Sequence, residues 1–127
     1  MFSHVAVGTN DLERAKKFYD AVLGALGYGE GVLRPKGDYV YASDSGLFIV
    51  TPPVDGKPAT HANGGTVGFA CQSAEQIERW HAAGLANGGT SVEDPPGIRN
   101  TPAGALYLAY MRDPDGNKLC ALHRMPA

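Results

Sequence analysis

Cys120 is the residue whose chemistry the sequence raises most directly. It lies on a predicted strand, Lys118–His123, that follows the turn Asp113-Pro-Asp-Gly116. Its thiol could serve as a metal ligand, as a nucleophile, or as a small apolar side chain in a packed sheet. A nucleophile needs an activating base and a third group that orients it, and no oxyanion-hole signature accompanies Cys120. We therefore favour the packing role.

Arg99 and three tyrosines are the candidates for contact with a small ligand. Arg99 follows the predicted turn of "DPPGIRNTP", and its guanidinium is suited to a carboxylate or phosphate. The alternative is a surface arginine that pins its loop to a carboxylate such as Asp94. Tyr39 and Tyr41 share one face of their strand, and Tyr110 lies on the strand after Arg99. If these rings face a cavity, they offer aromatic walls to a planar molecule.

The composition limits the function classes. With 127 residues, the chain fits one domain that can bury a core without metal or disulfides. A net charge of −2 argues against nucleic acid as a partner, and no apolar run could span a membrane. The N-terminus lacks the pattern of a signal peptide. Cys71 and Cys120 have no CxxC spacing, so we expect two reduced thiols in a cytoplasmic protein.

The elements that position these residues occur twice. Asn10-Asp-Leu-Glu13 and Ser73-Ala-Glu-Gln76 both resemble capping boxes at the start of a helix, with Asn10 and Ser73 as the capping residues. An offset of 62 residues aligns Phe18 with Trp80. The predicted strands are residues 3–7, 31–34, 38–42 and 47–51, then 66–71, 90–93, 105–112 and 118–123. The sequence therefore predicts a single α+β domain of two βαβββ modules, residues 1–51 and 65–124, joined by a connector at 52–64.

Strand alternation divides the residues between two faces of a curved mixed sheet. The apolar face, which should pack on the helices, carries Val5, Val7, Val67, Phe69, Cys71, Leu119 and Ala121. The opposite face carries His4, Ala6, Thr66, Gly68, Ala70, Lys118, Cys120 and Leu122. Many of these second-face side chains are small, so we expect them to leave room for a cavity.

Three segments carry a resemblance to a known family. They are "FSHVAVGTNDLERAKKFYDAVLGALGY", "GGTVGFACQSAEQIERWHAAGLANGG" and "YMRDPDGNKLCAL". Together they resemble the vicinal oxygen chelate superfamily, which includes glyoxalase I, bleomycin-resistance proteins, fosfomycin-resistance enzymes and extradiol dioxygenases. The resemblance covers essentially the whole chain. It is specific for the fold and much less so for any activity.

The resemblance implies four metal-ligand positions, two in each module. They map onto His4, Ile49, Thr66 and Cys120, where metal-using members usually carry histidines and carboxylates. Only His4 matches, and its alternative role is a hydrogen-bonded histidine within the cavity. Neither Ile49 nor Thr66 can act as the base that glyoxalase-type chemistry requires. We therefore expect no cofactor, although His4 and Cys120 together could still hold zinc, nickel, manganese or iron.

Two functions from different classes follow. The favoured one is a metal-free protein that binds a small molecule in the sheet cavity, as bleomycin-resistance proteins are understood to do. Its contacts would come from Arg99, Tyr39, Tyr41, Tyr110, Thr66 and Ile49. The alternative is a metal-dependent lyase, transferase or dioxygenase that uses His4 and an irregular ligand set. In either case the resemblance implies a homodimer, with or without exchanged modules.

Overall fold

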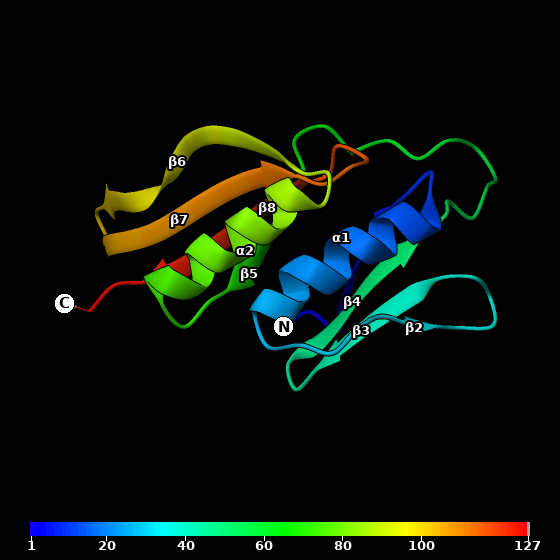
Figure 1. Cartoon of the computed structure of the whole chain (residues 1–127), viewed down its shortest axis with the longest axis horizontal. Coiled ribbons are helices and arrows are strands. Elements are labelled where there is room, and N and C mark those ends of the chain that lie inside the picture. The colour runs from blue at the N-terminus through cyan, green and yellow to red at the C-terminus, as the bar shows by residue number, and fades with distance from the viewer. Residues whose placement is uncertain (127) are drawn as a thin grey trace.

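The order of strands and helix repeats once along the chain (Figure 1). The computed structural model describes residues 1–126. Module 1 contains β1 (His4–Gly8), α1 (Leu12–Ala25), β2 (Val32–Leu33), β3 (Tyr39–Ser43) and β4 (Gly46–Thr51). Module 2 contains β5 (Val67–Ala70), α2 (Ala74–Ala86), β6 (Thr90–Thr101), β7 (Gly104–Arg112) and β8 (Lys118–Arg124). The repeated βαβββ order is therefore confirmed.

The strands form two four-stranded sheets, in the orders β1-β4-β3-β2 and β5-β8-β7-β6. In each sheet the first strand pairs in parallel with the last, and the other pairs are antiparallel. This arrangement confirms the α+β fold class. The sheets are separate, because the outer strands β1 and β5 do not form hydrogen bonds with each other.

The helices begin where short polar side chains can cap them. Ser73 caps α2 as predicted, because its hydroxyl accepts a hydrogen bond from the Gln76 N–H. The prediction that Asn10 caps α1 is wrong by one residue. Asp11 takes that role and accepts from the Arg14 N–H at 3.0 Å, which places the helix start at Leu12. Among residues 1–126, no helix is long and apolar enough to cross a membrane.

The predicted Pro-Pro-Gly turn before Arg99 is also wrong. Pro95 and Pro96 lie inside β6, which runs without a break from Thr90 to Thr101. A register shift between Val92 and Gly97 marks a bulge at this point. β6 is the edge strand of its sheet, so residues there can lack an N–H without costing the ladder a hydrogen bond.

One apolar core connects the two modules. The predicted helix-facing residues of β1, β5 and β8 all belong to this core or pack against it, with Leu119 and Ala121 fully buried. The helices α1 and α2 pack on each other and lie side by side at the centre of Figure 1, with one sheet on either side. Phe48 and Phe69 extend the core across the modules, with ring centroids 5.4 Å apart.

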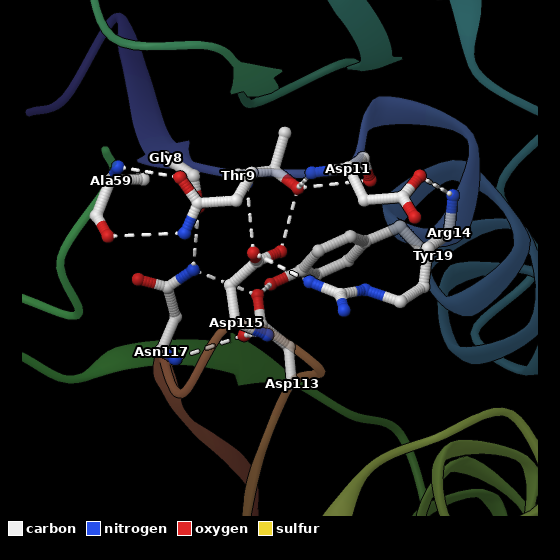
Figure 2. A network of polar contacts seen from close by, with 10 residues as sticks. Gly8, Thr9, Asp11, Arg14, Tyr19, Ala59, Asp113, Asp115 and Asn117 are labelled. Atoms are coloured by element: carbon white, nitrogen blue, oxygen red, sulfur yellow. Dashed lines mark hydrogen bonds and ion pairs between the residues drawn. The ribbon is translucent and has the colours of Figure 1, made fainter. Parts of the chain in front are cut away.

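A buried polar network joins the β7–β8 turn of module 2 to the start of α1 in module 1 (Figure 2). Asp113 is 4% exposed and accepts a hydrogen bond from the Tyr19 hydroxyl at 2.5 Å. Asp115 accepts from the Thr9 hydroxyl at 2.6 Å, and the Asn117 amide donates to the Gly8 carbonyl at 3.0 Å. The turn therefore fixes the position of module 2 relative to module 1.

Candidate functional site

The four positions implied as metal ligands lie on the open faces of the two sheets, the faces turned away from the helices. The strand registers place Ile49 and Cys120 at equivalent positions of β4 and β8. His4 opens β1, and Thr66 comes directly before β5 at the equivalent place in module 2. Each module thus contributes two of the four positions, and the β1 and β5 edges between them do not pair.

The side chains at these positions do not fit the usual four-ligand metal site. Ile49 has no donor atom, and Thr66 has only a neutral hydroxyl. His4 is exposed, and its Nδ1 forms a hydrogen bond with the Ser3 hydroxyl at 2.8 Å. Within residues 1–126, no three His, Cys, Asp or Glu side chains are placed to share a metal ion.

Cys120 is part of the packed sheet. It is 6% exposed, its Sγ lies 3.6 Å from the Ala121 carbonyl oxygen, and it lies opposite Tyr110 on the neighbouring strand β7. Burial raises the pKa of the Cys120 thiol, against the opposing effect of Tyr110. The thiol is therefore protonated at neutral pH, which disfavours it as a nucleophile.

Tyr110 lies beside Lys118 and Glu93, and sequence reasoning missed Glu93. The Lys118 Nζ lies 4.9 Å from the centroid of the Tyr110 ring and forms an ion pair with Glu93. Strand alternation had already placed Lys118 on the same face as Cys120. Glu93 could not have been found in this way, because its backbone adopts a positive φ of 58° next to the bulge in β6.

The Arg99 side chain forms hydrogen bonds within its own strand, β6. Its Nη2 donates to the backbone carbonyls of Asp94 and Pro95, each at 3.0 Å. Arg99 therefore fixes its local segment, which is the alternative role considered from the sequence. The acceptors are backbone carbonyl oxygens and not the Asp94 carboxylate. The register of β6 with β7 pairs Arg99 with Leu106, which places Arg99 on the open face of module 2.

Tyr39 and Tyr41 point toward α1 and not onto the open face. The Tyr39 hydroxyl donates to Glu13 at 2.9 Å, and the Tyr41 hydroxyl donates to Asp20 at 2.8 Å. Burial raises the pKa of Tyr41, and the Asp20 carboxylate raises it further. Both rings are less than 10% exposed and act mainly as core side chains, although Tyr41 also touches a cavity between the modules.

Two cavities lie where β1 faces β5. The first, of about 260 Å³, is lined by the start of β1, the end of α1, the β3–β4 hairpin and β5, including His4, Leu23, Tyr28, Phe48 and Phe69. We call it the intermodule pocket. The second, of about 250 Å³, lies near Gly8 and is lined in part by the connector residue His61 and by Thr66 and Lys118.

Comparison with known proteins shows which proteins share this fold. A crystal structure of a glyoxalase/bleomycin resistance protein from Albidiferax ferrireducens T118 is 63% identical, with a TM-score of 0.95 over 98% of this chain and 99% of that one. A glyoxalase/bleomycin resistance protein/dioxygenase family enzyme from Burkholderia phytofirmans PsJN shares the fold at 17% identity and a TM-score of 0.75, over 97% of this chain and 98% of its own.

Lactoylglutathione lyase from Agrobacterium tumefaciens also shares the fold, at 21% identity and a TM-score of 0.67 over 97% of this chain and 92% of its own. Among curated proteins, none matches this chain. The family model for the Glyoxalase/Bleomycin resistance protein/Dioxygenase superfamily matches residues 1–121. The chain therefore belongs to the Glyoxalase/Bleomycin resistance protein/Dioxygenase superfamily.

Proposed function

We propose that this protein binds a small organic molecule on the open faces of its sheets, without the four-ligand metal site of metal-using relatives. The observation that carries the proposal is the chemistry at the four equivalent positions. Only His4 offers an imidazole, while Ile49 has no donor and Cys120 is a buried, protonated thiol. Metal-assisted proton transfer needs an ion and a nearby carboxylate, and none of these four positions supplies the carboxylate.

The open faces are suited to a ligand with a flat apolar part. The strand registers align mainly apolar or small side chains in a row across each sheet. The rows are Val32, Val40, Ile49 and Ala6 in module 1, and Val92, Tyr110, Cys120 and Gly68 in module 2. The Tyr110 ring provides a stacking surface, and a ligand carboxylate beside it would share the Lys118 ammonium with Glu93. A small aromatic acid combines these properties.

Homodimerisation is part of this proposal. Within residues 1–126, no strand pairs with the facing edges of β1 and β5, so a second copy could complete a cavity over these edges and the open faces. Light scattering should give about twice the chain mass of 13.3 kDa. A mass of 13.3 kDa would contradict the dimer.

Elemental analysis separates the metal-free function from the metal-dependent alternative. The protein should be purified without chelators and without an immobilised-metal column. We expect far less than one equivalent of zinc, nickel, manganese or iron per chain. More than about half an equivalent, lost in His4→Ala and retained in the matched control His81→Ala, would instead support a metal-dependent lyase, transferase or dioxygenase that uses His4.

A ligand screen tests the binding site itself. Thermal-shift measurements with benzoate, salicylate and naphthoate should show stabilisation that Tyr110→Ala removes. The matched control is Tyr107→Ala, because Tyr107 lies on the same strand but faces α2, where its hydroxyl bonds with Glu78. Equal loss in both variants would place the effect in strand β7 as a whole and would contradict the open-face site.

A further inference from the structure

The intermodule pocket has walls suited to an aromatic ring. Leu23, Phe48 and Phe69 come from the apolar core, and the two phenylalanine rings meet edge to face with an interplanar angle of 70°. At the mouth, Phe2 is 73% exposed and Tyr28 is 38% exposed. Exposed apolar side chains at the entrance of an apolar cavity are typical of a ligand-binding site.

The pocket also meets two unpaired strand edges. The Ser3 carbonyl accepts from the Leu47 N–H, so the peptide groups of His4, one residue further along, point away from β4. Likewise the Cys71 N–H donates to Leu122 on β8, so the peptide groups of Ala70 point away from β8. By the same alternation Gly68 points to the free side of β5, and no strand pairs with either free edge within residues 1–126. His4, Gly68 and Ala70 all line the pocket.

These two features together select one class of ligand. A purely apolar molecule would leave the peptide N–H and C=O groups without partners, and a charged one would have to lose its water beside aromatic rings. An amide presents a donor and an acceptor side by side, as a neighbouring strand would. We propose that the intermodule pocket binds a flat aromatic molecule bearing a lactam or amide, whose N–H and C=O pair with the free edges of β1 and β5.

The pocket differs from the site proposed around Tyr110, although the open-face residues His4, Gly68 and Ala70 also line it. Its helix-side wall, including Leu23 and Phe48, belongs to the core between the modules, whereas Tyr110 and Cys120 lie on the other side of their sheet. Its volume of about 260 Å³ lies just below the range of about 300–1,000 Å³ for ligand sites, which favours a molecule of two fused rings.

Quinolin-2-one is the probe for this proposal, because its lactam lies on the edge of a flat bicyclic ring. In ¹⁵N-labelled protein, titration should shift the amide resonances of His4, Tyr28, Gly68 and Ala70 while leaving those of Tyr110 and Cys120 unchanged. N-methylquinolin-2-one lacks the donor and should bind roughly fivefold to tenfold more weakly. Shifts centred on Tyr110, or equal affinity for the two probes, would overturn the proposal, as would the absence of saturable shifts.

A variant that fills the pocket provides the second test. Val5 lines the pocket on the helix side, so Val5→Phe should weaken quinolin-2-one binding by about tenfold or more. Val54→Phe makes the same exchange at a fully exposed connector position and should leave binding unchanged. If Val5→Phe does not fold, Tyr28→Ala removes a wall at the partly exposed mouth and should weaken binding several-fold. Unchanged affinity in the folded pocket variant would overturn the site.

Discussion

Replacing Asp113 by alanine tests whether the polar turn of module 2 stabilises the contact with module 1. Asp113 accepts four hydrogen bonds, from the Tyr19 hydroxyl, the Asn117 side-chain amide, and the backbone N–H groups of Asp115 and Asn117. The Asn117 side-chain amide has two N–H groups, and only the one bonded to the Gly8 carbonyl keeps its acceptor. The substitution therefore leaves four donors without an acceptor. One of them is the hydroxyl of the fully buried Tyr19.

The size of the effect follows from these four donors. A donor left without its partner costs about 1–1.5 kcal/mol, so the four together cost about 4–6 kcal/mol. Burial raises the pKa of Asp113, which means that the ionised carboxylate carries a desolvation cost that alanine removes. We therefore expect the lower end, a loss of about 4 kcal/mol in unfolding free energy, equivalent to a fall in Tm of roughly 15 °C.

Urea denaturation followed by circular dichroism measures this loss. Asp44→Ala is the matched control, because Asp44 is exposed in the corresponding turn between β3 and β4 and should change stability by less than about 0.5 kcal/mol. Tyr19→Phe alone should cost about 1 kcal/mol, and the double variant should fall short of the sum of the two single losses by a similar amount. A loss below about 1 kcal/mol for Asp113→Ala, or strict additivity, would refute the reasoning.

Three further substitutions or reactions test other parts of the structure. Hydrogen bonds from Arg34 lower the pKa of Asp38 from its ordinary value of 3.8, so its stabilising contribution is present above that value and is lost as the pH falls. In urea denaturation, the stability advantage of the native protein over Asp38→Asn should therefore shrink below about pH 4; a constant difference down to pH 3 would contradict this. Iodoacetamide at pH 7.5 should alkylate Cys120 about tenfold more slowly than free cysteine, as measured by mass spectrometry, because burial raises the pKa of this thiol. Gly89→Ala should cost about 1–3 kcal/mol, because a Cβ there would lie 2.8 Å from a phenylalanine ring and 2.9 Å from a carbonyl oxygen. The control Gly24→Ala meets nothing within 4 Å and should be neutral or stabilising by about 0.5 kcal/mol.

Local patterns in the sequence predicted the order of the elements and the core-facing side of strands β1, β5 and β8. Ser73 caps α2 because its acceptor and the Gln76 N–H lie within one turn of the chain. The alternation of Leu119 and Ala121 with Cys120 identified the buried face of β8, because successive strand residues point to opposite sides. These features depend on neighbours within a few residues, so the sequence carries them directly.

Predictions went wrong where a distant segment decides the local structure. Asn10 does not cap α1, because its side-chain amide bonds with the connector residue Ala59, at 2.7 Å and 3.2 Å. The prolines of β6 do not form a turn, because β6 is an edge strand and tolerates missing N–H groups. In both cases the local sequence pattern is typical of the predicted structure, but a contact or strand position that exists only in the folded protein determines the outcome.

From the sequence alone one can predict the repeated βαβββ order, the family resemblance and the unusual residues at the four positions that this resemblance implies. Three further features require the folded structure: Tyr41 faces α1, Lys118 and Glu93 join Tyr110, and a pocket opens between β1 and β5. The residues at the four implied positions can be read directly from the sequence, because aligning short segments of the chain with the family is enough to find them. The faces of neighbouring strands and the gap between two sheets depend on how helices α1 and α2 pack together. That packing joins a helix that ends at Ala25 to one that begins at Ala74.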